Sequence, residues 1–400
     1  MSDTAADPRL LRAPPKKGIR LSWADERLRA IVWQILVLGV VFGIIGWLVS
    51  NTQHNLEVRR IATGFGFLSR EAGLPVAESL IPYSPTDTYS RALLVGVLNT
   101  LKIAVVGVIL ATIIGTLIGI ARLSKNWLLS RIAAVYVEVV RDLPLLLQLL
   151  FWYAILQGLP GPRQALHPME GVFLSNRGLK LPWIQWQDAH SFALLGFVLG
   201  IVITVLYARA AKARQMADGQ PRRVWPAALG LILGLPVLIW AGLGAPWTGD
   251  IPALRGFNFQ GGVTVTPEYF ALLVGLVMYT AAFIAEIVRA GILAVAKGQW
   301  EAAEALGLQR GLIMRKIVLP QALRVIVPPM TSQYLNLTKN SSLAVAIGYQ
   351  DIVSISNTTL NQTGQAIEGI AIIMAVYLTI SLSISLFMNW YNSRIALVER

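Results

Sequence analysis

The sequence has no cysteine, few charged residues and only three histidines, and each scarcity removes a class of function. Without cysteine there is no disulfide, no catalytic thiolate and no cysteine-ligated metal. The histidines His54, His167 and His190 lie far apart, without the spacing of metal ligands, so we expect no metal site. Only 14% of the residues are charged and 55% are hydrophobic, whereas soluble domains carry roughly a quarter charged residues. The chain is therefore predicted to be an all-α integral membrane protein with lipid as its outer solvent.

Eight uncharged apolar stretches are near or above the ~17–20 residues that cross the hydrocarbon core as a helix. They are Ile31–Ser50, Ile103–Ala121, Leu143–Leu159, Ser191–Ala208, Val224–Gly244, Tyr269–Ala285, Val325–Gly348 and Gly369–Tyr391. The polar, basic residues 1–30 precede a stretch long enough to span, so no cleavable signal peptide is expected. Between the stretches, the outward segments rich in Trp, Pro and Gly are predicted to be turns and interfacial anchors rather than an independent domain.

The net charge of +13 is explained by basic residues in cytoplasmic loops rather than by nucleic-acid binding. Basic residues are concentrated before the first span and in alternate loops, and eight spans return the chain to its starting side. The loop residues are Arg122, Lys125 and Arg131, then Arg209, Lys212, Arg214, Arg222 and Arg223, then Arg289, Lys297, Arg310, Arg315, Lys316 and Arg324. Both termini are therefore predicted to be cytoplasmic.

The loop at residues 298–320, between the sixth and seventh predicted spans, has the pattern of two short helices joined by a turn. Its first part, Gln299–Leu306, is rich in strong helix formers, and Gly307 is placed to end that helix in a left-handed conformation. A second, basic helix is predicted over Leu308–Val318, until Pro320 interrupts it. On this pattern alone, the loop is either a docking element or an amphipathic connector without a partner.

The residues of this loop resemble the EAA loop of permease subunits of ABC importers. The matching positions are Glu301, Ala302, Ala303, Gly307, Ile317, Leu319 and Pro320. Flanking segments are similar to the polar amino-acid branch of that family, and most of all to the general L-amino-acid (Aap/Bzt-type) permease large subunits. These segments are Asn99–Leu101, Arg141–Gln148, Ala282–Gly291, Pro320–Ala322 and Gln333–Leu343, with Asp142 standing where the family usually has a small residue.

The resemblance implies that residues 298–320 form a coupling helix that docks in a groove of a separate ATPase. The chain itself has no Gly-x4-Gly-Lys-Ser/Thr phosphate loop, so ATP and Mg²⁺ are expected on the partner and no cofactor on this chain. The implied partners are an ATP-binding subunit dimer, a second similar permease or a second copy of this chain, a periplasmic substrate-binding protein and membrane lipid. The implied function is L-amino-acid import across a bacterial inner membrane, with Glu, Gln, Asp and Asn in the substrate range, by a transporter subunit that is not an enzyme.

The resemblance also divides the chain. A five-span core of the type I importer kind corresponds to residues 89–156 and 267–397. Residues 157–266 form an insertion with two extra spans, residues 31–88 an additional first span with a periplasmic loop, and residues 1–30 a cytoplasmic basic segment.

Span seven carries a lysine, Lys339, ~22 Å along the helix from its cytoplasmic start. An ionised lysine there costs at least a few kcal/mol unless it faces water or a partner. Short polar side chains surround it: Asn336, Thr338, Asn340, Ser341 and Ser342. Two interpretations remain open, a substrate pathway that meets a carboxylate, or a lysine that snorkels or pairs within the protein.

Other charged pairs fit local structure. Glu286 and Arg289 are one helical turn apart and predict an ion pair, and Arg141 with Asp142 beside Pro144 predicts a pinned bend. Alternative functions are an ABC importer subunit for another polar solute, such as an opine or betaine, or an ion-coupled secondary transporter. A membrane enzyme is a further alternative, but the sequence shows no nucleophile–base or metal constellation.

Overall fold

The computed structural model describes residues 26–59, 63–220 and 223–395, and these fall into two compact units. The first unit, residues 1–65 with 363–365, contains the helix α1 (Glu26–Val58). Large apolar side chains such as Leu38, Phe42 and Trp47 are exposed along α1. A helix that is apolar on all sides suits a lipid environment, as predicted for the first span.

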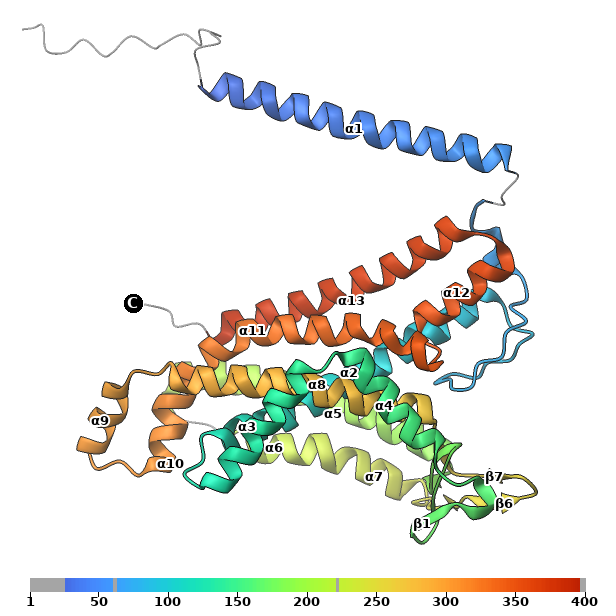
Figure 1. Cartoon of the computed structure of the whole chain (residues 1–400). Helices are drawn as coiled ribbons and strands as arrows, with labels where there is room; N and C mark the ends of the chain where they lie inside the picture. Colours follow the sequence, from blue (N-terminus) through green and yellow to red (C-terminus); the bar gives the residue numbers. More distant parts are fainter. Residues whose placement is uncertain (1–25, 60–62, 221–222, 396–400) are drawn as a thin grey trace, which may run out of the picture. The chain divides into compact units, whose positions relative to one another are not determined.

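The second unit, residues 66–362 with 366–400, is built around one central helix, α8 (Pro267–Leu293). No residue of α8 before Ala290 is exposed, because α8 packs against four other helices. These are α2 (Tyr89–Arg122), α3 (Trp127–Asp142), α4 (Leu145–Gln157) and α11 (Leu319–Asn340). The chain ends with η6 (Ser341–Ile347), α12 (Ile352–Thr363) and α13 (Ala366–Ile395), and α13 packs on α11 (Figure 1).

Small residues allow α2 to approach α8 closely. A Cβ atom added at Gly115 would lie 2.7 Å from Ile284 Cβ and 2.8 Å from the backbone oxygen of Ala281. A Cβ at Gly119 would lie 2.7 Å from the oxygen of Ala285. Close backbone approach through small residues is a common packing mode of membrane helices, where lipid supplies no hydrophobic driving force between them.

The third predicted span, Leu143–Leu159, is only the second half of a bent helix pair. It corresponds to α4, and α3 precedes it at an angle of 104°. The side chain of Gln148 holds the bend, because its Nε2 donates to the carbonyl oxygens of Val140 (2.9 Å) and Leu143 (3.0 Å). The bend predicted beside Pro144 is present. Among the described residues no ion pair joins Arg141 to Asp142, so Gln148 rather than this charged pair holds the bend.

The insertion contains a helical hairpin and short strands. The hairpin consists of α5 (Asp188–Asp218) and a returning segment made of α6 (Trp225–Leu229), the π-helical η4 (Gly230–Gly234) and α7 (Leu235–Gly242). These match the two predicted extra spans. The strands were not predicted; they replace part of the expected turns.

The strands form antiparallel sheets at the end of α8 opposite its connection to α9, and β3 pairs with β8 to join both ends of the insertion (Figure 1). The largest sheet has the order β1-β2-β3-β8, and smaller pairs are β4-β5 and β6-β7. The strands are β1 (Leu166–Met169), β2 (Val172–Ser175), β3 (Gly178–Leu181), β4 (Trp183–Ile184), β5 (Gly249–Asp250), β6 (Ala253–Arg255), β7 (Asn258–Gln260) and β8 (Val263–Val265). Short 3-10 turns lie at η2 (Phe65–Ser69) and η3 (Pro162–Gln164).

Among the described residues, six helices are long and apolar enough to cross a membrane, and seven if the bent pair α3–α4 counts as one span. The predicted seventh span, Val325–Gly348, is the exception. It is the 22-residue α11 followed by η6, and α11 carries two internal prolines and a series of polar side chains. Its length suits a membrane crossing, so its polar composition needs a functional explanation.

Candidate functional site

The predicted coupling loop folds as two short helices at the end of α8, as expected. The first is α9 (Lys297–Ala305), and Gly307 follows it with φ +70°, the left-handed conformation that the sequence predicted. The second comprises α10 (Arg310–Ile313) and the π-helical η5 (Met314–Val318). An exposed ion pair of 3.8 Å between Glu304 and Arg310 spans the turn and adds little stability.

Pro320 does not interrupt the second helix, contrary to the prediction. The backbone stays helical from η5 into α11, and Pro320 occupies the first turn of α11, where a missing N–H is tolerated. The wider π turn of η5 lies directly before the proline. Single π-helical turns recur at functional positions of helices. The consequence is that α10, η5 and α11 form one continuous connection from the loop into the bundle.

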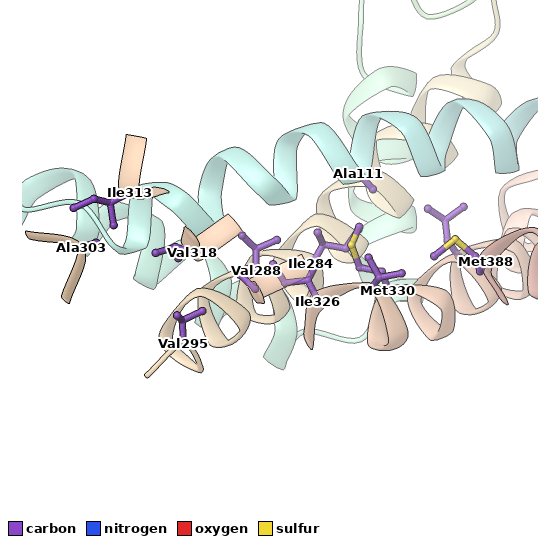
Figure 2. Close-up of a cluster of buried hydrophobic side chains, with 13 residues drawn as sticks. Ala111, Ile284, Val288, Val295, Ala303, Ile313, Val318, Ile326, Met330 and Met388 are labelled. Atoms are coloured by element: carbon purple, nitrogen blue, oxygen red, sulfur yellow. The ribbon is translucent and has the colours of Figure 1, made fainter. Parts of the chain in front are cut away.

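The two faces of the loop differ. Glu301 and Ala302 are exposed, and Leu306 is 78% exposed. Ala303, by contrast, is 2% exposed and belongs to a hydrophobic cluster with Ile313. Figure 2 shows this cluster in a row, with Ala303 and Ile313 at one end and Met388 of α13 at the other. The cluster also contains Val318 of η5, Ile284 and Val288 of α8, and Ile326 and Met330 of α11.

This cluster makes the loop a continuation of the bundle core. Among the predicted motif residues, Ile317 is half-buried, whereas Gly307, Leu319 and Pro320 are exposed with Glu301 and Ala302. A force applied to the exposed face would therefore pass through close-packed side chains to α8 and α11. Packed interiors have low compressibility and transmit displacement.

The polar cluster predicted on span seven separates into two groups. Thr338 and Ser341 are buried. The hydroxyl of Thr338 donates to the backbone oxygen of Tyr334 (2.9 Å), and that of Ser341, the first residue of η6, donates to the backbone oxygen of Thr338 (2.7 Å). Asn340 and Ser342 are half-buried, and Ser342 donates to the oxygen of Lys339 at 2.8 Å. These local bonds satisfy the hydroxyls without any solute.

Asn336 and Lys339 are the exposed members of the predicted cluster. They extend an exposed line on α11 at helical spacing, made of Val325, Pro328, Pro329, Ser332, Asn336 and Lys339. Within the described part of the chain, no ion pair involves Lys339. The structure thus separates the two exposed side chains from four that are buried or half-buried.

Two ion-pair clusters tie α2 to its surroundings. Near the C-terminal end of α2, Glu286 accepts from Arg289 (3.0 Å), as predicted, and also from Arg122 of α2, which the sequence did not suggest. Nearer the N-terminal end of α2, Lys102 lies 2.9 Å from Glu78 and 4.1 Å from the ring centroid of Tyr269. Burial raises the pKa of Glu78, whereas the hydrogen bond and the positive charge of Lys102 lower it. Sequence reading missed this second cluster because Glu78 lies in a loop outside every predicted span.

Comparison with known proteins identifies the architecture. Residues 219–397 match the model of the binding-protein-dependent transport system inner membrane component family. The chain is 50% identical over 385 residues to the general L-amino acid transport system permease protein AapQ of Rhizobium johnstonii, and the match covers 96% of each chain. The chain belongs to the amino-acid ABC importer permeases.

Two further relatives agree. YhdX of Escherichia coli (strain K12), which bears the name of an amino-acid ABC transporter permease, is 53% identical over 382 residues, covering 95% of this chain and 97% of that one. The glutamate/glutamine/aspartate/asparagine transport system permease protein BztB of Rhodobacter capsulatus is 44% identical over 423 residues, covering 97% and 99%. The protein is thus a multi-pass inner-membrane subunit of a transporter, not an enzyme, and permeases of this family work with an ATPase and a substrate-binding protein.

Proposed function

We propose that this amino-acid ABC importer permease moves L-amino acids into the cytoplasm when a separate ATPase subunit, docked on residues 298–320, hydrolyses ATP. The observation that carries the proposal is the two-sided loop: Glu301 and Ala302 are exposed, whereas Ala303 and Ile313 are packed into the core of the bundle. ATP and Mg²⁺ would bind the partner, and closure of the ATPase dimer would move the loop. Glu301 would anchor the contact, and Gly307 would set the angle between the two helices.

Substrate range is proposed from the relatives. AapQ and BztB bear names that specify general L-amino acids and glutamate, glutamine, aspartate and asparagine. We expect a similarly broad range here, through a pathway along the exposed line of α11 that ends at Asn336 and Lys339. A second permease, either a homologue or another copy of this chain, would close the other side of that pathway. The unpaired ammonium of Lys339 favours solutes with a carboxylate.

The docking proposal is tested by Gly307→Val in the complete transporter in proteoliposomes. A valine at φ +70° is strained, but it meets no atom within 4 Å, so the helix angle should change without a clash. Substrate-stimulated ATP hydrolysis and uptake should fall by about fivefold to a hundredfold, in line with a strain of ~1–3 kcal/mol. Gly234→Val is the matched control, since Gly234 lies outside residues 298–320 and also has no neighbour within 4 Å and no positive φ. Equal activity of wild type and Gly307→Val would refute the coupling role.

The pathway proposal is tested by Lys339→Gln. Uptake of acidic amino acids should fall more than uptake of neutral ones, because the lost charge interacts most strongly with a second carboxylate. Thr338→Val serves as the control, because its hydroxyl bonds only within α11. Equal losses for acidic and neutral substrates, or no loss, would exclude a carboxylate contact.

The proposed orientation, with both termini in the cytoplasm, has a direct test. The chain has no cysteine, so single cysteines introduced at Ala302 and at Phe257 report without background. In intact cells a membrane-impermeant maleimide should label Phe257→Cys and not Ala302→Cys. The reverse pattern would invert the topology.

A further inference from the structure

The broken span α3–α4 carries two residues of opposite charge, and neither belongs to the exposed line of α11 described above. Glu138 and Arg141 are both exposed and lie one helical turn apart on α3. Within the described part of the chain, no ion pair or side-chain hydrogen bond involves either residue. Side chains three positions apart on a helix are neighbours, whereas adjacent ones such as Arg141 and Asp142 do not face each other. Glu138 and Arg141 are therefore an unpaired acid and base on one helix face.

Counted as one span, α3 and α4 place this pair near the middle of the membrane. The helices α3 and α4 contain 16 and 13 residues, or ~24 Å and ~20 Å of helix. Folded at 104°, with both halves tilted equally, they advance about 27 Å, close to the ~30 Å hydrocarbon core. Arg141 is the next-to-last residue of α3, so it lies at the junction of the two halves. This depth does not depend on which way the chain is oriented.

Contacts around Arg141 fix its guanidinium. It lies 5.0 Å from the ring centroid of Phe283 on α8, and that ring is 4.9 Å from the ring of Tyr279. A cation over an aromatic face is attracted to it and keeps its N–H donors free at the edge of the guanidinium. Gln148 holds the neighbouring carbonyls of the bend. The guanidinium of Arg141 is thus held against α8, while its N–H donors have no protein partner among the described residues.

Two unpaired charges at this depth are costly in lipid and are tolerated where they face a water-filled path or a polar solute. A solute that pairs with both Glu138 and Arg141 at once carries a cationic group and an anionic group close together. The α-ammonium and α-carboxylate of an amino acid share one carbon atom, which is the spacing that a glutamate and an arginine one turn apart can bracket.

We propose that Glu138 and Arg141 bind the α-ammonium and the α-carboxylate of the transported amino acid. This inference rests on the proposed amino-acid import and deepens it. Recognition of the group common to all α-amino acids permits a broad substrate range.

The test is uptake of labelled L-glutamine by the complete transporter in proteoliposomes, with Arg141→Gln and Glu138→Gln. Each should raise the half-saturating concentration by about tenfold to a hundredfold, the usual effect of losing a charge-assisted hydrogen bond. ATP hydrolysis without substrate should stay unchanged. Arg131→Gln and Asp142→Asn are matched controls, exposed charged residues of the same helix, and both should transport like wild type.

Competition by analogues separates recognition from a structural role. L-glutamine methyl ester lacks the carboxylate charge, and the des-amino acid lacks the ammonium. Wild type should prefer glutamine over both. Arg141→Gln should lose only the discrimination against the ester, and Glu138→Gln only the discrimination against the des-amino acid. Retained discrimination in both variants, or the same losses in Arg131→Gln, would overturn the proposal.

Two safeguards keep the outcome clear. Arg141→Met provides a second neutral variant, and if neither Arg141 variant reaches the membrane, the isosteric Glu138→Gln decides by its own competition pattern. Wild type that transports no amino acid would refute the proposed function itself. Wild type that transports, with both variants indistinguishable from it, would refute only this inference.

Discussion

The central helix α8 and the inserted hairpin α5–α7 both depend on close backbone contacts at glycine, yet they are embedded very differently. On the α8 side, α2 contacts α8 through Gly115 and Gly119, and α8 exposes nothing before Ala290. In the hairpin, a Cβ added at Gly200 of α5 would lie 2.1 Å from the backbone oxygen of Leu231. The buried residues of α5 are few, and α7 has none.

Of the two regions, α8 is the one that contacts the residues of the proposed sites. The helix α8 contacts α2, α3, α4 and α11, supplies Phe283 beside Arg141, and supplies Ile284 and Val288 to the cluster that holds the coupling loop. The hairpin packs mainly on itself and connects to α8 through the pairing of β3 with β8. We infer that a defect in α8 packing affects transport directly, and that a defect in the hairpin remains local.

The largest expected effect is that of Gly115→Val. Its side chain would overlap Ile284 Cβ and the oxygen of Ala281, and because one of these is backbone, the helices must separate. Overpacking of this kind costs ~1–3 kcal/mol or more. We expect loss of uptake and a lower melting temperature of the purified complex. Gly234→Val in the hairpin, where no atom lies within 4 Å, is the control. A Gly115→Val protein with wild-type melting and uptake would contradict the central place of α8.

A smaller effect on transport is expected from Gly200→Val. The substitution clashes with the backbone of Leu231, so α5 and its returning segment must move apart, at a similar local cost of ~1–3 kcal/mol. Because the hairpin packs mainly on itself, uptake should fall by less than about twofold, while thermal unfolding should begin earlier. Uptake and a melting curve on the same preparation decide the matter. A loss of uptake as large as that of Gly115→Val would show that the hairpin is part of the transport machinery.

Much of this architecture could be predicted from the sequence because long apolar runs and helix-ending glycines are local signals. The two spans of the insertion and the left-handed Gly307 are examples. The helix α3 escaped notice because Arg131, Glu138 and Arg141 interrupt its apolar pattern. The strands escaped because none exceeds four residues.

The candidate site residues, too, could be predicted only in part from the sequence. The sequence grouped Thr338, Ser341 and Lys339 by proximity along the chain, but only tertiary packing reveals that the first two are buried and the third exposed. The π turn at η5 likewise depends on how the chain enters the bundle, since Pro320 alone predicts a break. Lys102 and Glu78 are 24 positions apart, and their pairing becomes visible only when the loop before α2 folds onto that helix.

The smallest expected effect concerns Asp351, whose carboxyl group is buried between η6 and α12. None of the acidic residues described in the hairpin is buried to the same extent. Its oxygens accept from the backbone N–H of Ser354 (2.9 Å) and from the hydroxyl of Tyr377 (3.4 Å). Burial raises the pKa of Asp351 from 3.8 to about 7. The folded state therefore holds a proton that the unfolded chain releases.

That stabilising contribution is complete below about pH 4 and is lost as the pH rises through about 7. Asp351→Asn keeps an oxygen for the N–H of Ser354 and stays neutral at every pH. The melting temperature of wild type, measured relative to that of Asp351→Asn, should therefore fall by a few degrees between about pH 5 and pH 8. The exposed Asp188→Asn controls for general pH effects and should melt in parallel with wild type. Parallel curves for wild type and Asp351→Asn would mean that the carboxyl ionises in the folded protein without cost. The core around α12 would then be as open to water as the hairpin surface, and the contrast between the two regions would be smaller than their packing suggests.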